Sequence, residues 1–276
     1  MRDNFIYENH QGRTFSGLEN GVYLNYSDLR NYDWKYDTIN DKISRFYRPI
    51  TTRKIPLQLR GKTDTQATAV KNQLLELTDT DIIARKPGKI YIGEYYTNGY
   101  ITSSRKSNYL LTKQYAQIDL QIVSDDPAWY REQHHSFLPG SDDDVALAGG
   151  TDYPYDYPYD YPLALKGQKI ICESVDSNPF RLIIYGPIEN PTLSIGDNIY
   201  RINGNVAAGE VLTIDSLSKT ITLTLANGQK MNWFSKRDRN NYIFASIPSG
   251  QNSVSWSGKF GFDLTVIEKR SEPKWI

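Results

Sequence analysis

A short repeat near the middle of the chain excludes both a helix and a central strand. Residues 152–162 read Asp-Tyr-Pro-Tyr-Asp-Tyr-Pro-Tyr-Asp-Tyr-Pro, so proline recurs at every fourth position. Each proline fixes its own φ, lacks a backbone donor and pushes the preceding residue toward extended geometry. Neither an α-helix nor the interior of a sheet tolerates that spacing. We predict a semi-rigid spacer with polyproline-like geometry.

The segment around this repeat divides the chain into two predicted domains. An aspartate run and a glycine pair precede the repeat, and neither contributes to a core (Asp142, Asp143, Asp144, Gly149, Gly150). We predict a linker over residues 138–165, with one folded domain at 1–137 and a second at 166–276. The 276 residues suffice for two domains with separate cores. A spacer is the simplest role for the repeat, and the alternative is that its tyrosines stack on a partner or a sugar.

Charge and cysteine content exclude several functional classes. The net charge is zero overall, and it is +3, −6 and +3 over residues 1–137, 138–165 and 166–276. Neither domain is basic enough to predict nucleic-acid binding. Cys172 is the single cysteine, which excludes a disulfide within the chain. No apolar run has the length of a signal peptide or a membrane span, so we expect a soluble protein made in the cytoplasm.

The first domain is predicted to contain one helix. Thr63 followed by Gln66 is a capping-box pattern, and an apolar stripe comes next at spacings of three and four residues (Ala67, Val70, Leu74, Leu77). This pattern predicts a helix over about 63–84 that lies on a sheet. The rest of the domain is predicted to be mainly antiparallel sheet, in a barrel-like or sandwich-like arrangement.

Strands of the first domain are predicted at 22–26, 32–36, 43–47, 50–59 and 118–122, and apolar residues alternate with polar ones in 50–59 and 118–122. Pro56 predicts that strand 50–59 lies at an edge or starts near the proline, because proline donates no ladder hydrogen bond. Asn98-Gly99 predicts a two-residue hairpin turn between 94–97 and 100–104.

The second domain is predicted to be a β-sandwich, because short strands alternate with turn residues such as Asn227-Gly228 and no helical periodicity occurs. The predicted strands are 169–173, 180–185, 191–195, 198–202, 211–215, 220–225, 241–246, 252–256 and 260–268. In the last of these, one face is predicted to be core (Phe260, Phe262, Leu264, Val266).

No set of residues in the sequence predicts an active site. The histidines are His10, His134 and His135, and the adjacent pair points to opposite sides of an extended chain, which disfavours a shared metal ion. Cys172 lies in an apolar strand, where a buried, inert thiol is usual. The basic cluster at 236–239 is interpreted as a solvated loop. We predict no catalytic, cofactor-binding or metal-binding residues, and no enzyme activity.

Several segments occur in an order shared with one known family. In the second half these are 178–181, 186–191, 209–215 and 247–265. In the first half, Arg45-Phe46 and Ile55-Pro56-Leu57 precede the helix, and a hairpin at 91–100 and a strand ending in Asp126-Pro127 follow it. This order resembles the distal tail protein family of siphophages, the long-tailed, non-contractile bacteriophages. The resemblance spans most of the chain, but the linker 138–165 has no counterpart, and the second half lacks the inserted carbohydrate-binding module of some members.

The resemblance implies a non-enzymatic virion structural protein at the phage tail tip or baseplate, with a role in host adsorption. It implies a homohexameric ring between the tail-tube protein and the tail-associated fibre or lysin protein. The first domain is then tail-tube-like, closes the ring and extends a belt-like arm to a neighbour. The second is then a galectin-like β-sandwich, to which receptor-binding proteins dock in some phages. The family requires no cofactor, nucleic acid or membrane.

Two other functional classes are alternatives to this hub. A lectin-like module would bind host cell-wall saccharides through the C-terminal sandwich, where Trp233 and Trp256 could stack on sugars, although 166–276 contains no histidine. A wall-degrading hydrolase would need paired carboxylates in a cleft, and the only carboxylate cluster lies in the linker.

Aromatic residues near the N-terminus predict contacts between copies of the chain. They show little periodicity that would bury them in their own domain (Phe5, Tyr7, Phe15, Tyr23, Tyr26, Tyr32, Trp34, Tyr36). Tyr and Trp are favoured at interfaces because they combine a large area with a polar group. The alternative is that these residues complete the core of a monomer.

Overall fold

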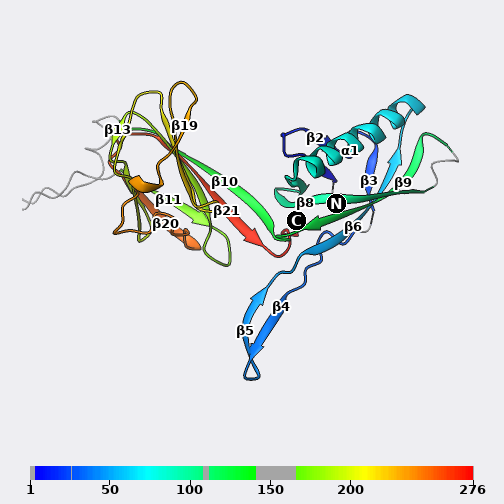
Figure 1. Ribbon diagram of the computed structural model, residues 1–276, viewed down its shortest axis with the longest axis horizontal. Helices are drawn as coiled ribbons and strands as arrows, with labels where there is room; N and C mark the ends of the chain where they lie inside the picture. The colour runs from blue at the N-terminus through cyan, green and yellow to red at the C-terminus, as the bar shows by residue number, and fades with distance from the viewer. Residues whose placement is uncertain (1–3, 26, 108–111, 141–165, 276) are drawn as a thin grey trace, which may run out of the picture. The chain divides into compact units, whose positions relative to one another are not determined.

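The computed structural model describes residues 4–25, 27–107, 112–140 and 166–275, which form two compact units (Figure 1). The first unit comprises Met1–Arg131 and Lys269–Ile276, and the second comprises Glu132–Glu268. The chain passes from the first unit to the second within strand β10 (Trp129–Phe137) and returns within strand β21 (Phe262–Arg270). The return of the last residues to the first unit was not predicted. The repeat at 152–162 and most of the predicted linker lie outside the described residues, so the predicted boundaries stay predictions.

The first unit is built on antiparallel strands that meet at one long strand, β8 (Tyr95–Ser107). On one side, strand order runs from β10 through β8 to β7 (Gly88–Ile92), β1 (Ile6–Glu8) and β2 (Thr14–Ser16). On the other side, β8 pairs with β9 (Tyr115–Ser124), and the order continues to β6 (Thr51–Arg60) and β3 (Val22–Leu24). The predicted alternation in β9 is confirmed, because Ile118, Leu120 and Ile122 are all buried.

Helix α1 (Asp64–Ala84) lies on this sheet, as predicted from its narrow apolar stripe (Figure 1). The predicted stripe is buried in the core of the unit (Ala67, Val70, Leu74, Leu77). Thr63 Oγ1 accepts a hydrogen bond from the backbone N–H of Gln66 at 3.2 Å, and Gln66 Oε1 accepts from the N–H of Lys62 at 3.0 Å. Both predicted capping residues therefore satisfy backbone groups at the start of the helix.

One local prediction in this unit holds and another was wrong. Strand β6 pairs with β9 along its whole length but with β3 only at residues 57–59, so Pro56 lies in a part of the strand that has one partner, as predicted. Pro56 is accommodated because it lies just beyond the last residue that pairs with β3. Asn98-Gly99 lies inside β8 rather than in a turn, and the hairpin between β7 and β8 turns at residues 93 and 94 instead.

Close packing explains why glycine occupies position 99. A Cβ on Gly99 would lie 2.6 Å from the side chain of Ile122 and 2.6 Å from Ser124 Oγ. Ile122 is fully buried, so its side chain has little room to move. The glycine thus permits close approach of two strands, a role that the dipeptide does not distinguish from a turn.

The second unit is a β-sandwich around one hydrophobic core. One sheet has the order β19 (Lys230–Asn232), β18 (Thr220–Thr224), β17 (Val211–Asp215), β12 (Phe180–Tyr185) and β21. The other has the order β11 (Lys166–Cys172), β20 (Gly250–Trp256), β14 (Thr192–Ile195) and β15 (Asn198–Arg201), and β13 (Ile188–Glu189) pairs separately with β16 (Asn205–Val206). Buried side chains from both sheets form a single cluster, so the two sheets enclose the core between them.

Most strands of the second unit match their predicted positions. The predicted core face near the C-terminus is confirmed (Phe260, Phe262, Leu264, Val266). The predicted strand 241–246 is wrong, since this segment is irregular although Ile243 and Phe244 are buried. Within the described residues, the only other helical element is the short 3₁₀ turn η1 (Phe234–Lys236). The prediction of a mainly β protein with a single α-helix is therefore confirmed.

Candidate functional site

The most distinctive surface of the first unit is a two-stranded hairpin that extends away from its sheet (Figure 1). It consists of β4 (Lys35–Ile39) and β5 (Lys42–Tyr47), joined by Asn40 and Asp41, both with positive φ. Two left-handed residues are what a tight type I′ hairpin turn requires, and Asn and Asp tolerate that conformation better than most residues. Within the described residues, β4 and β5 pair only with each other.

Apolar and aromatic side chains of this hairpin are exposed. Every residue of β4 and β5 is exposed, including several large hydrophobic ones (Tyr36, Ile39, Ile43, Phe46, Tyr47). Phe46 is 58% exposed, Ile43 54% and Ile39 66%. An isolated two-stranded hairpin is marginally stable at best, and its free edges offer unpaired backbone groups. Such an element is expected to gain stability by covering its apolar side chains with a partner.

The base of the hairpin is fastened by the end of the chain. The Arg48 guanidinium lies 4.3 Å above the Trp34 ring, and Ser271 Oγ accepts hydrogen bonds from Trp34 Nε1 at 3.3 Å and Arg48 Nη2 at 3.1 Å. Arg30 lies 4.2 Å above the Trp275 ring and donates to the carbonyl of Pro273 at 3.1 Å. These contacts hold both strands of the hairpin where they leave the unit.

The aromatic residues that were predicted to form contacts between copies divide into two groups. Phe5, Tyr7 and Phe15 are buried in the core of their own unit, so the prediction was wrong for these three. They belong to β1 and β2 or adjoin them, and such short strands show too little alternation to reveal burial. Tyr32, Trp34 and Tyr36 are exposed at the hairpin and its base. Tyr23 is half-buried, and Tyr26 lies outside the described residues.

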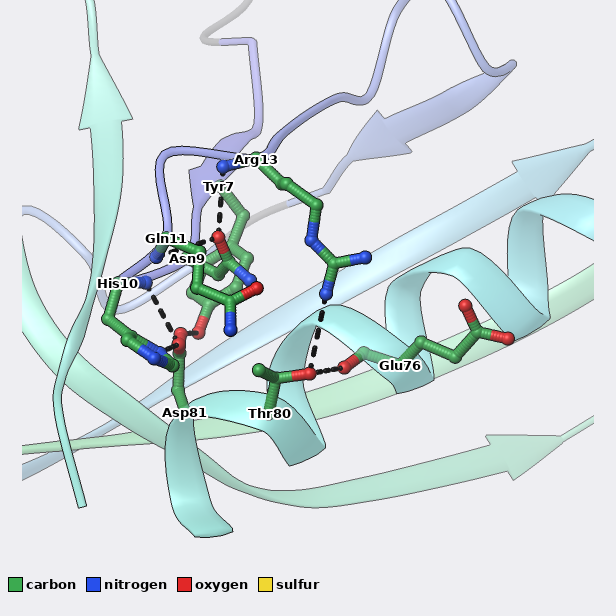
Figure 2. A network of polar contacts seen from close by, with 8 residues as sticks. All are labelled: Tyr7, Asn9, His10, Gln11, Arg13, Glu76, Thr80 and Asp81. Carbon is green, nitrogen blue, oxygen red and sulfur yellow. Dashed lines mark hydrogen bonds and ion pairs between the residues drawn. The ribbon is translucent and has the colours of Figure 1, made fainter. Parts of the chain in front are cut away.

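The buried carboxylate of Asp81, on α1, contacts polar groups of the N-terminal segment. Figure 2 shows Tyr7, in the middle of β1, and His10, in the turn after this strand, reaching Asp81. Asp81 accepts hydrogen bonds from the Tyr7 hydroxyl, from the His10 backbone N–H at 2.9 Å and from His10 Nδ1 at 2.5 Å. The nearby turn is ordered by Asn9, whose side-chain oxygen accepts from the backbone N–H groups of Gln11 and Arg13.

The Tyr7–Asp81–His10 cluster joins the N-terminal segment to α1, and it is too buried for a substrate to reach it. Tyr7 and Asp81 are fully buried, and the His10 side chain is only 13% exposed. Burial, together with the hydrogen bond to Asp81, raises the pKa of Tyr7 far above its ordinary value, so its hydroxyl stays protonated. The sequence did not reveal the cluster, because Asp81 falls in a helix whose pattern identifies only apolar partners.

Within the described residues, His134, His135 and Cys172 do not join a cluster of possible metal ligands. His134 Nδ1 lies 3.0 Å from Thr265 Oγ1, and burial lowers the pKa of its neighbour His135, assisted by the charge of His134. Cys172 is buried, as predicted, and burial raises the pKa of its thiol. Among the described residues, no three or more His, Cys, Asp and Glu side chains gather closely enough to hold a metal ion. The aspartates at 142–144 lie outside the described residues.

The two tryptophans that were expected to be able to stack on sugars pack within the second unit. Trp256 is 1% exposed, and its Nε1 donates to the carbonyl of Phe260 at 3.1 Å. Trp233 is partly buried, packs against the same core and lies against Gly204. Trp256 therefore cannot stack on a sugar.

In the described part of the chain, no helix is both long and apolar enough to cross a membrane.

Comparison with solved structures identifies proteins of the same fold. The crystal structure of the SPP1 Dit (gp 19.1) protein, described as a paradigm of hub adsorption apparatus in Gram-positive infecting phages, matches with a TM-score of 0.57 at 11% identity. That match covers 98% of this chain and 100% of the Dit chain. A chain of the phage P2 baseplate in its activated conformation with Ca matches with a TM-score of 0.63 at 12% identity, over 99% and 100% of the two chains.

A second structure of the p2 baseplate, in its activated conformation with Sr, gives a TM-score of 0.62 at 12% identity and the same coverage. No protein-family model matches the sequence. No curated protein matches it either. The structural likeness, which spans nearly the whole chain, establishes a fold shared with these phage hub and baseplate proteins.

Proposed function

We propose that this protein is the hub of a siphophage tail tip, a non-enzymatic structural component of the virion made in the host cytoplasm. Six copies close into a ring through the first unit. The ring joins the tail-tube protein to the tail-associated fibre or lysin protein, and the second unit offers a docking place for receptor-binding proteins. The proposal is supported by the fold shared along nearly the whole chain with the SPP1 hub protein and the P2 baseplate chain.

The observation that carries the proposal is the exposed hairpin of β4 and β5. Its large apolar side chains are exposed, whereas its base is held by Arg48 and Ser271. A fixed base and an uncovered tip are what an arm needs in order to contact a neighbouring copy. A contact of this kind joins two different surfaces, and repeated head-to-tail contacts close a ring when the rotation between copies permits it.

The polar clusters support a structural role over an enzymatic one. The Tyr7–Asp81–His10 cluster is closed to solvent at Tyr7 and Asp81, and its hydrogen bonds connect β1 to α1. A hydrolase would need two carboxylates facing one cleft. The buried carboxylate of Asp81 faces a phenol and an imidazole instead.

The role of the hairpin is tested by removing apolar contact from its surface. In Ile43→Ser, an exposed isoleucine of β5 is replaced, and in the matched control Ile83→Ser an even more exposed isoleucine of α1 is replaced. Both variants should fold with unchanged melting temperature. When each is mixed with the tail-tube and fibre or lysin proteins and imaged by electron microscopy, Ile43→Ser should form far fewer rings than the control. Equal ring yields from both variants would contradict the arm contact.

The lectin alternative loses its expected stacking residue. Trp256 lies in the core and Trp233 packs against it, so sugar binding by the second unit would need another surface. Such a surface would add to the hub role and would not replace it, because the hairpin belongs to the first unit.

A further inference from the structure

An aromatic and cationic pocket occupies the loop side of the second unit. The pocket has a volume of about 720 Å³ and is lined by residues 234 and 237–244 together with Lys219. This size lies within the range of pockets that hold small organic ligands. The segment at its wall is the irregular stretch 237–244, which was predicted to contain a strand and instead follows η1 as a loop.

Three aromatic rings pack together in this pocket. Phe244 is buried at the base, and the rings of Phe234 and Phe244 stack with centroids 6.0 Å apart at 20°. Tyr242 meets Phe244 edge-on, with centroids 6.0 Å apart at 76°. Tyr242 is 64% exposed, so its ring remains available to a ligand, whereas Phe234 is 39% exposed and carries the Arg237 guanidinium above its ring.

Lys219 approaches these aromatic rings from a turn with left-handed backbone geometry. It adopts a φ of +55° in the turn between β17 and β18, where glycine or asparagine would be less strained. Asp215 Oδ1 fixes this turn by accepting from the N–H groups of Leu217 at 2.9 Å and Ser218 at 3.0 Å. The Lys219 ammonium lies 5.5 Å from the ring centroids of both Tyr242 and Phe244. Strained backbone of this kind is concentrated at functional sites.

Two arginines add further positive charge. Arg237 lies 4.1 Å above the Phe234 ring, and its Nη1 donates to the Phe234 carbonyl at 2.8 Å. Arg239 also lines the pocket and is exposed. None of the cations Lys219, Arg237 and Arg239 forms an ion pair with a carboxylate of the described residues. The one carboxylate in the lining, Asp238, accepts instead from the Asn240 N–H at 3.1 Å and Asn241 Nδ2 at 2.8 Å.

We propose that this pocket binds an anionic saccharide, a glycan chain that carries phosphate groups. The exposed ring of Tyr242 stacks against the C–H face of a sugar ring, and the Arg237 guanidinium, held above Phe234, faces a phosphate group of the glycan. The excess of positive charge selects a negatively charged ligand, and guanidinium groups match the geometry of phosphate oxygens. An exposed aromatic ring, combined with cations that form no ion pair with a carboxylate of the described residues, favours such a ligand over a neutral sugar.

The pocket lies on one unit and does not use the hairpin. Saccharide binding is therefore independent of ring closure, and loss of either function can be measured while the other persists. An acidic protein surface is the other occupant that the charge would accept, and the experiment distinguishes it from a glycan.

The test uses the full chain and a matched pair of probes, mannopentaose phosphate and mannopentaose, which differ by one phosphate group. Isothermal titration calorimetry and saturation-transfer NMR should detect the phosphorylated probe, with the neutral probe at least tenfold weaker. Inorganic phosphate and a glutamate-rich decapeptide serve as further ligands. Each should bind at least tenfold more weakly than the phosphorylated pentasaccharide.

Two variants locate the site. Tyr242→Ala removes an exposed ring, and Lys219→Asn removes a charge while placing a better-suited residue at positive φ. Both should weaken binding of mannopentaose phosphate at least fivefold, and Lys219→Asn should do so with an unchanged or raised melting temperature. The control Lys259→Ala removes an exposed cation elsewhere in the same unit and should leave binding unchanged.

Several outcomes would overturn the proposal. Equal affinity for the two pentasaccharides would remove the anionic requirement, and inorganic phosphate binding as tightly would remove the saccharide. Tighter binding of the decapeptide, lost in the same variants, would assign the pocket to an acidic protein partner. No detectable binding of the phosphorylated probe at millimolar concentration, or binding that survives both variants, would leave no saccharide site here.

Discussion

Replacement of Asp81 by alanine should destabilise the first unit specifically. The variant would leave the Tyr7 hydroxyl and the His10 backbone N–H without the acceptor they share, in a region where Tyr7 is fully buried. Leaving a buried polar group unsatisfied costs about 1–3 kcal/mol, so two such groups predict a loss of about 3 kcal/mol. For a unit of this size, that loss lowers the melting temperature by about 10 °C.

Differential scanning calorimetry would measure this effect, with the transition of the second unit as an internal reference. Asp79→Ala is the matched control, because Asp79 is an exposed carboxylate two residues away in the same helix. Tyr7→Phe should cost about 1–2 kcal/mol alone and much less when combined with Asp81→Ala, since both changes remove the same hydrogen bond. Equal melting temperatures for Asp81→Ala and Asp79→Ala would refute the stabilising role that we assign to Asp81.

Three other predictions concern pH, packing and the base of the hairpin. Burial raises the pKa values of Tyr7 and Tyr200 above the ordinary value of 10. The unfolded chain therefore loses these protons at lower pH than the folded chain, and the free energy of unfolding should fall as pH rises above about 10. Denaturation titrations between pH 8.5 and 11 would show that fall, and an unchanged stability would contradict it. Gly99→Ala should cost about 1–3 kcal/mol because its Cβ would overlap the buried Ile122, whereas a neutral result in urea denaturation would show that β8 and β9 can separate. Trp34→Ala should speed hydrogen exchange in β4 and β5 without lowering the melting temperature of the second unit, and unchanged exchange would mean that the Arg48 stacking does not fasten the hairpin.

The sequence identified elements wherever a periodic pattern met a buried surface. The stripe from Ala67 to Leu77 predicted both the helix and its buried face, and the alternation from Phe260 to Val266 predicted a strand and its core side. These patterns are reliable because burial is repeated several times along one element. A single dipeptide carries less information, as Asn98-Gly99 shows, since glycine serves close packing as readily as a turn.

Features that depend on distant contacts were not accessible from the sequence. Tyr7 and Asp81 are 74 residues apart, and nothing near either residue indicates the other. The pocket at 237–244 was likewise not apparent, because Lys219 reaches it from the turn between β17 and β18. The exposed hairpin was partly predicted through Tyr32, Trp34 and Tyr36, but the same argument wrongly included Phe5, Tyr7 and Phe15. Composition alone cannot separate aromatics of a core from aromatics of an interface.

The number of copies in the assembled tail tip tests the central claim most directly. The full chain would be mixed with its tail-tube and fibre or lysin neighbours, and the product would be imaged by electron microscopy and weighed by native mass spectrometry. The hub proposal predicts closed rings with six-fold symmetry and six copies of this chain. Persistent monomers in that mixture, or rings of another symmetry, would contradict it.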